Sequence, residues 1–238
     1  MDIITTQAGI EFLLRWLHFL AGITWIGVLY YFNFIQTPFF GSELGGSAKS
    51  AMTRGLVPNA LWWFRWGAML TFLTGWTIVL LRLHSGISLG DGYMTRILTG
   101  GVMGSFMWFN VWFVIWPAQR DYAIKSAEQV AAGGEAVPGT PEKGALAGRA
   151  SRTNTLFSIP LLFFMGSAMH LPWLDNGTND LLYWIVAGAV IVLVELNAFR
   201  GTPATQKPLA SVSGTIHVGL GLTLVLYVIG TVLNARPN

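Results

Sequence analysis

Six apolar stretches of about 20 residues recur along this chain, and they limit its possible folds more than any other feature. A stretch of this length is what an α-helix needs to cross a hydrocarbon core of roughly 30 Å. Only 11% of the 238 residues are charged, which is too few to cover the surface of a soluble domain. We therefore expect an all-α, polytopic membrane bundle of about six transmembrane helices, forming a single domain over residues 1–238.

The apolar runs set the expected helices. They cover residues 11–36, 61–83, 93–116, 154–172, 180–199 and 211–234. Pro38, Pro117 and Pro172 each follow an apolar run and predict that the helix before them ends there. The longest expected loop, 117–153, begins with the helical stretch AQRDYAIKSAEQVAA and continues with the flexible segment GGEAVPGTPEKG, which predicts a cytoplasmic connector.

Basic residues predict the orientation. The expected loops 37–60, 117–153 and 200–210 contain Lys49, Arg54, Arg120, Lys125, Lys143, Arg149, Arg152, Arg200 and Lys207, whereas the opposite side has only Arg15, Arg82, Arg96 and Arg236. The positive-inside rule then makes the first group cytoplasmic and turns the N-terminus outward. The net charge of +3 is explained by this asymmetry, and we expect no nucleic-acid partner. The opening MDIITTQAGIEF has no basic n-region, so we expect no cleavable signal peptide.

The chain contains no cysteine, which excludes disulfides, iron–sulfur clusters, thiolate zinc sites and covalently attached c-type haem within it. Histidine is the strong nitrogen ligand that remains. Its four histidines are therefore the candidate metal ligands, and haem b, in one or two copies, is the candidate cofactor.

His18 lies on the one polar face of the first expected helix. On a helical wheel, eight residues fall within about 60° of it: Glu11, Arg15, Gly22, Trp25, Leu29, Phe32, Asn33 and Gln36. Gly22 leaves room for a flat macrocycle one turn away, and Arg15 could pair with a haem propionate. The simpler alternative is that His18 hydrogen-bonds a neighbouring helix.

The other histidines lie near helix ends. His84 and His170 share the expected outer side with His18, and Phe163, Gly166 and Ser167 lie on the His170 face. His217 is expected toward the cytoplasm. Gly221 follows it at the same four-residue distance at which Gly22 follows His18. Each could instead be solvated or bonded to a backbone carbonyl.

Further polar residues have both functional and structural interpretations. Arg96 near the outer end of the third expected helix could hold a propionate or an anionic substrate, while Asn110 on the same face could tie helices together. Glu195 and Arg65 are expected near the cytoplasmic ends, either paired or snorkelling. The tryptophan clusters, which include Trp62, Trp63, Trp66, Trp108, Trp112 and Trp116, are typical of an interfacial belt.

Four blocks of sequence resemble the urate oxidase N-terminal family of bacterial membrane proteins. They are RWLHFLAGITWIGVLYYFNFIQTPFF, VPNALWWFRWGAMLTFLTGW, WFNVWFVIWPAQR and ASRTNTLFSIPLLFFMGSAMH. The element LH-x6-WIG is also similar, at a greater distance, to the bacterial protoporphyrinogen oxidase family that binds b-type haem. The matching positions are His18, Trp25, Asn33, Gln36, Arg65, Asn110, Asn154 and His170.

The resemblance implies a membrane oxidoreductase component of the bacterial inner membrane, with urate as substrate and a cytochrome as electron acceptor. Members of this type carry a C-terminal cytochrome c domain, which this cysteine-free chain lacks, so a separate cytochrome c or other redox partner is expected on the outer face. Urate is planar and anionic, so a site for it would need an arginine and amide side chains, which Arg15, Arg96, Asn33 and Gln36 could provide only if they converge.

Our leading hypothesis is a haem b subunit with His18 and His170 as the first ligand pair and His84 as the alternative ligand. The rival hypothesis is a cofactor-free accessory subunit of a larger respiratory or photosynthetic membrane complex. A transporter is disfavoured, because the sequence shows neither inverted repeats nor paired broken helices.

Overall fold

The computed structural model describes residues 3–171 and 180–234, and every regular element in them is a helix. The first rod contains α1 (Gln7–Tyr30), the π-helical η1 (Tyr31–Gln36) and α2 (Thr37–Phe40), and the second is α3 (Glu43–His84). The third contains α4 (Gly92–Phe109), η2 (Asn110–Ile115), α5 (Trp116–Ala118), η3 (Gln119–Ile124) and α6 (Lys125–Ala131). Then follow α7 (Thr140–His170), α8 (Asp180–Arg200), the short α9 (Pro203–Gln206) and η4 (Lys207–Ala210), and finally α10 (Val212–Asn234).

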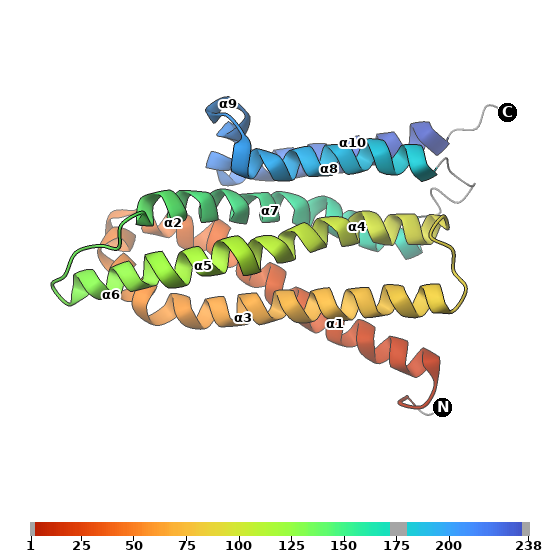
Figure 1. The fold of residues 1–238 in the computed structure, drawn as a ribbon, viewed down its shortest axis with the longest axis horizontal. Coiled ribbons are helices and arrows are strands. Elements are labelled where there is room, and N and C mark those ends of the chain that lie inside the picture. Colours follow the sequence, from red (N-terminus) through yellow and green to blue (C-terminus); the bar gives the residue numbers. More distant parts are fainter. Residues whose placement is uncertain (1–2, 172–179, 235–238) are drawn as a thin grey trace.

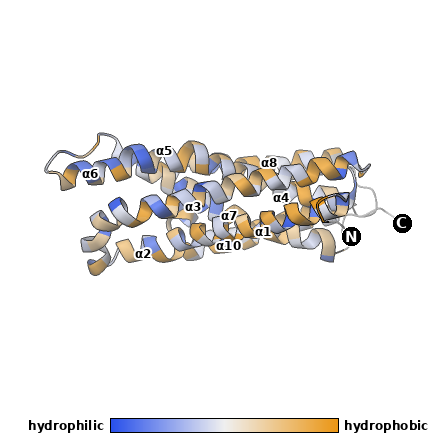
Figure 2. Cartoon of the chain, turned by 90° about the horizontal axis from the view of Figure 1, so that it is seen from below, coloured by the Kyte–Doolittle hydropathy of each residue, from blue (hydrophilic) through white to orange (hydrophobic). Residues whose placement is uncertain are grey.

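The long rods lie side by side in an elongated bundle, and α1 begins at the same end at which α10 finishes (Figure 1). Five of the described helices are long and apolar enough to cross a membrane, and these contain α1, α3, α4, α8 and α10. Hydrophobic residues run along the length of these rods (Figure 2). The predicted all-α membrane bundle is confirmed.

The remaining long helix, α7, spans 31 residues and is more polar than the other five. It packs against α1, α4, α8 and α10, and its buried residues include several with hydroxyl or amide groups. A polar helix is stable in an apolar bundle only when neighbouring helices satisfy its side chains. This helix is therefore where buried polar chemistry is concentrated.

Helix starts follow the capping rules. Thr6 accepts a hydrogen bond from the Gly9 amide, and Ser42 accepts one from the Gly45 amide, each at 3.1 Å. These side chains satisfy amides that the first turn leaves free. Because Ser42 caps it, α3 begins 18 residues before the predicted start at residue 61.

The expected loop at 37–60 was wrong over most of its length, whereas the helical stretch predicted at the start of the 117–153 connector is confirmed by α5, η3 and α6. Residues 43–60 belong to α3, and the predicted connector is helical except around residues 132–139. Hydropathy marks the part of a helix that can lie in lipid, while a helix can continue into water wherever its residues are good helix formers. Pro38 and Pro117 were also wrong as helix ends, whereas Pro172 and Arg236 lie outside the described residues.

Small residues allow close contacts between the rods. A Cβ atom at Gly67 of α3 would lie 3.2 Å from the Ala21 carbonyl oxygen and 3.2 Å from the Trp25 amide nitrogen, both on α1. A Cβ at Gly100 of α4 would lie 3.3 Å from the Leu161 carbonyl oxygen of α7. Glycine at such crossings lets helix backbones approach closely in a membrane. Trp25, 2% exposed, is thus a packing residue of the α1–α3 contact.

Candidate functional site

Two of the rods contain a π-helical segment that ends two residues before a proline. These are η1, followed by Pro38, and η2, followed by Pro117. Proline has no N–H to donate, and its ring clashes with the carbonyl four residues earlier, so a wider turn lets the helix continue. Because π-helical turns are frequent at functional sites, the buried polar residues inside them, Asn33, Gln36 and Asn110, are the first candidates.

Asn110 lies at the centre of three hydrogen-bonded side chains, which we call the amide–carboxyl cluster. Its Nδ2 donates to Oδ1 of Asn154 on α7 at 2.9 Å and to Oε2 of Glu195 on α8 at 3.2 Å. Nδ2 of Asn154 in turn donates to the Met107 carbonyl at 3.0 Å. Asn110 and Asn154 are fully buried, and Glu195 is 5% exposed. Three rods therefore meet around one set of polar groups.

Two acceptor atoms of the cluster have no hydrogen-bond partner among the described residues. They are Oδ1 of Asn110 and Oε1 of Glu195. A buried polar atom without a partner costs about 1–3 kcal/mol, so such atoms are uncommon. Polar groups at this depth in an apolar bundle are functional candidates. Both oxygen atoms can accept a hydrogen bond from an N–H or O–H group that is not among the described residues. Oε1 of Glu195, as a carboxyl oxygen, can also take up a proton.

A second polar group lies on the face of α7 that meets α1. Nδ2 of Asn33 donates to Oγ of Ser151 at 2.8 Å, and the Tyr30 hydroxyl lies 2.8 Å from Oγ of Ser158. Ser151 and Ser158 are separated by about two turns of α7, with the cluster residue Asn154 between them in sequence. The polar side chains of α7 therefore connect α1 on one side and α4 and α8 on the other.

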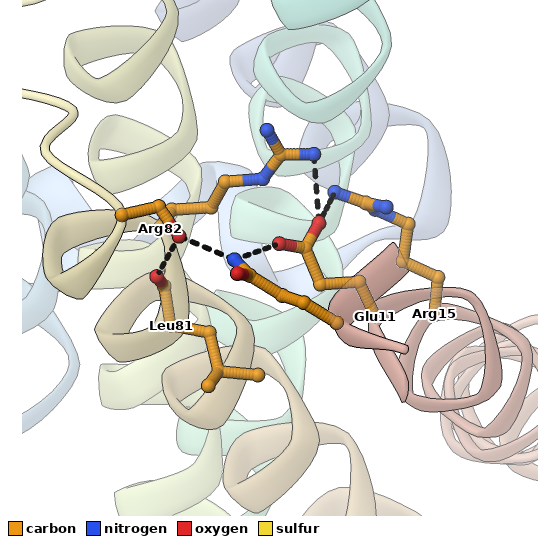
Figure 3. Close-up of polar contacts among 6 residues, drawn as sticks. Glu11, Arg15, Leu81 and Arg82 are labelled. Atoms are coloured by element: carbon orange, nitrogen blue, oxygen red, sulfur yellow. Dashed lines mark hydrogen bonds and ion pairs between the residues drawn. The ribbon is translucent and has the colours of Figure 1, made fainter. Parts of the chain in front are cut away.

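The opposite end of the bundle has a separate group of ion pairs. Oε2 of Glu11 lies 2.8 Å from Nη2 of Arg82 on α3 and 3.1 Å from Nη2 of Arg15 on α1 (Figure 3). Gln7 donates to Oε1 of Glu11 at 3.3 Å and also contacts Ser85. Arg15, predicted to pair with a propionate, is thus occupied by a protein carboxylate that joins α1 to α3.

His18 is positioned by the contact between α1 and α3. Its Nδ1 lies 3.0 Å from Oγ1 of Thr74, and a Cβ at Gly75 would lie 2.9 Å from its Cε1. A Cβ at Gly22 would lie 3.9 Å from Cγ2 of Thr71, so α3 occupies the space beside Gly22 that a macrocycle would need. The geometry matches the simpler interpretation of His18, a hydrogen bond to a neighbouring helix.

His170 has a different environment. It is exposed at the end of α7 and borders a shallow depression of about 330 Å³. The lining residues are Leu162, Phe163, Gly166, Ser167, His170 and Leu171. The sequence pattern predicted that Phe163, Gly166 and Ser167 share a helix face with His170, and the depression lies on that face. Of the two predicted ligands, only His170 borders open apolar space.

The remaining histidines are exposed. His84 is the last residue of α3, and Nδ1 of His217 lies 2.7 Å from the Ser213 carbonyl oxygen on its own helix. Among the residues that the structure describes, no three His, Cys, Asp or Glu side chains gather where they could hold a metal ion.

The four residues proposed for a urate site do not converge. Asn33 lies 18 residues after Arg15 along one rod, which separates them by roughly 27 Å at 1.5 Å per residue. Arg96 is 4% exposed and donates to the Ala168 carbonyl at 3.3 Å, near the end of α7. The arginines and the amides therefore belong to opposite ends of the bundle.

Comparison with known proteins decides the family. A family model described as urate oxidase N-terminal matches residues 89–226, more than half of the chain. The protein belongs to the urate oxidase N-terminal family. No curated protein and no solved structure matches the chain.

The urate oxidase N-terminal match contains the whole amide–carboxyl cluster, together with His170 and the α7 face beside it. It begins at residue 89, after the first two sequence blocks that carried the resemblance. His18, Trp25 and Arg65 therefore lie before the matched stretch. The part of the fold that is assigned to the family is also the part that holds the most deeply buried polar residues.

The sequence reasoning missed several residues of this site. It treated Glu195 as paired or snorkelling and took Arg152 only as a topology signal, although Arg152 has a buried Nη1 without a partner among the described residues. It did not consider Ser151 or Ser158. The spacing of Ser151, Thr155 and Ser158 at three to four residues could have revealed a hydroxyl-bearing face on this helix.

Proposed function

We propose that the protein is a membrane-integral oxidoreductase component of the urate-oxidase type, with its N-terminus outward in a bacterial inner membrane. The observation that carries this proposal is that the amide–carboxyl cluster lies wholly inside the family match. Urate is the proposed substrate, and a separate cytochrome c is the proposed electron acceptor, since these 238 residues contain no cysteine to attach a c-type haem.

The cluster supports a role in proton handling. Removing electrons from a substrate that carries N–H groups also releases protons, so the reaction needs a nearby proton acceptor. Oε1 of Glu195 is the free carboxyl oxygen, while Oε2 is held by Nδ2 of Asn110. Asn110 is fixed by Asn154, so the carboxyl group has one orientation. In this proposal Glu195 accepts the proton at Oε1, and the two asparagines are positioning residues.

We further propose haem b as the cofactor, with His170 as its protein ligand on the α7 face. The apolar depression beside His170 supports this choice, and the packing of His18 against Gly75 argues against a His18–His170 pair. A bound haem would supply one-electron transfer through its iron. Phe163 and Leu162 would cover an apolar ring face and exclude water there.

Haem content tests the cofactor. The protein is expressed with haem supply and purified in detergent, and a reduced-minus-oxidised spectrum and haem per polypeptide are measured. We expect a b-type band in the unaltered protein and in His18→Ala. His170→Ala should largely remove this band, and His84→Ala, which alters an exposed histidine, is the control that should keep it. Loss of haem in His18→Ala but not in His170→Ala would contradict the ligand assignment.

Turnover tests the reaction. Urate oxidation with a cytochrome c acceptor should fall about 100- to 10,000-fold in Glu195→Gln, the usual range for losing a general base. Glu142→Gln, an exposed carboxylate at the start of α7, should keep wild-type turnover. Equal activity of the two variants would exclude Glu195 as the proton acceptor.

A cofactor-free accessory subunit is the second candidate function. The observation that favours it is the enclosed position of His18, which is used for helix packing. In this case the unaltered protein shows no b-type band and no urate turnover, and it copurifies with a larger membrane complex. A b-type band that survives gel filtration would exclude this alternative.

A further inference from the structure

Arg65 of α3 lies among three tryptophan rings, which together with it we call the Arg–Trp site. Its guanidinium carbon is 4.0 Å from the ring centre of Trp116, 5.2 Å from that of Trp112 and 5.5 Å from that of Trp66. All three distances are within the range of cation–π attraction. Trp66 and Trp112 meet edge to face at 5.5 Å, which holds the rings around the cation.

The positive charge of the site has no acidic partner among the described residues. Arg65 takes part in none of their ion pairs. Arg120 lies 5.7 Å from the centre of the Trp116 ring and adds a second guanidinium, which contacts Asp121 at 2.6 and 2.7 Å. The nearby carboxylate is therefore already bound, and no described acidic residue compensates the charge of Arg65.

Two buried N–H groups of the site also have no acceptor among the described residues. They are Nε of Arg65 and Nε1 of Trp112. A buried donor normally finds an acceptor in the protein or in a bound molecule. Two such donors beside a free guanidinium suit the oxygen atoms of one anion, and arginine is particularly suited to phosphate.

The depth of the site identifies the source of that anion. Trp62, Trp63 and Trp66 begin the apolar part of α3, after a helical extension that starts at Glu43. Trp62 and Trp63 are 49% and 59% exposed on the outside of the bundle. Exposed tryptophans at the end of an apolar run mark the headgroup level of a bilayer. Phosphate groups of lipids are concentrated at this level.

We propose that the Arg–Trp site binds the phosphate of an anionic phospholipid in the leaflet that borders the α6 end of the bundle. Arg65 supplies the charge, and rotation of its side chain and of the Trp112 ring would turn Nε of Arg65 and Nε1 of Trp112, which are buried in this structure, toward the phosphate oxygens. The tryptophan rings contact the glycerol and the first acyl carbons. Trp112 lies two residues after Asn110 on η2, but the hydrogen bonds of the amide–carboxyl cluster involve no residue of the Arg–Trp site, so the lipid proposal does not depend on the redox proposal.

Tryptophan fluorescence provides the test, because the reporter rings belong to the site. The full-length protein is reconstituted into vesicles that contain brominated phosphatidylglycerol or brominated phosphatidylcholine, whose bromine atoms quench nearby tryptophans. We expect about a fivefold preference for phosphatidylglycerol, the value for one arginine at an anionic membrane surface. Arg65→Gln should abolish this preference and Arg65→Lys should keep most of it. Arg54→Gln, which alters an exposed arginine on the same helix, should leave it unchanged.

Each result decides the proposal. Equal quenching by the two lipids in the unaltered protein would overturn it, and this measurement needs no variant to fold. A preference that Arg54→Gln reduces as much as Arg65→Gln would show a general surface-charge effect and would also overturn it. Inorganic phosphate added to the vesicles should not compete; if it removes the preference, the site binds a free anion and not a lipid.

Discussion

Replacing Asn110 with alanine should destabilise the bundle by an amount that can be worked out from two contacts. The change removes the hydrogen bonds from Nδ2 to Asn154 at 2.9 Å and to Glu195 at 3.2 Å. An interhelical hydrogen bond in a membrane contributes about 0.6–2 kcal/mol. We therefore expect Asn110→Ala to lower the free energy of unfolding by about 1–4 kcal/mol, measured by reversible unfolding in mixed micelles.

A double-mutant cycle separates this interaction from loss of packing. Asn110→Ala, Asn154→Ala and the double variant should show a coupling free energy of about 0.6–1.7 kcal/mol, the range measured for such pairs. A control cycle pairs Asn110→Ala with Asn33→Ala, because Asn33 bonds to Ser151 and to the Leu29 carbonyl and shares no partner with Asn110. Its effects should add within about 0.5 kcal/mol.

Additive effects of Asn110→Ala and Asn154→Ala would refute the predicted coupling between the two side chains. Additivity would mean that the bond between the two amides contributes nothing to stability, and the cluster would then not fix the orientation of Glu195. A coupling that appears equally in the Asn33 control would point to a global change in packing.

Two further predictions concern the contact between α1 and α3. Gly67→Ala should cost about 1–3 kcal/mol in the free energy of unfolding, because the new Cβ would lie 3.2 Å from α1 backbone atoms, whereas Gly27→Ala should be neutral or stabilising because nothing lies within 4 Å. Equal costs would show that Gly67 does not set the helix separation. Glu11→Gln should cost about 1 kcal/mol at low salt and less at high salt, since both arginine partners are partly exposed; a salt-independent loss would exclude the ion pairs as its cause.

Hydropathy predicted the ends of the last two long helices closely where the described residues continue beyond them. Helix α8 ends at Arg200 and α10 begins at Val212, each one residue from the predicted 199 and 211. The other long helices continue into water, where their length depends on caps such as Ser42 and on helix propensity. A scale that measures transfer into lipid contains no information about that part of a helix.

The candidate site was predicted less well, because a helical wheel assumes one constant turn and one neighbour. His18 and Asn33 were placed on the same face of the first helix, but His18 contacts Thr74 of α3 while Asn33 contacts Ser151 of α7. When rods cross at an angle, one face of a helix can contact one neighbour near one end and a different neighbour further along, as here with α3 and α7. Asn110 and Asn154 were marked by the family resemblance, and only coordinates could show that Glu195 joins them.

The π-helical segment η2 also makes the molecule sensitive to the length of its sequence. Its turn holds about one residue more than an α-helical turn. Deleting one residue between Asn110 and Ile115 would restore the ordinary pitch while α5 and α6 keep their orientation, and the ring of Pro117 would then clash with the carbonyl four residues before it. A gap at this position in a related sequence that keeps the proline would therefore signal a kinked helix or a helix end there.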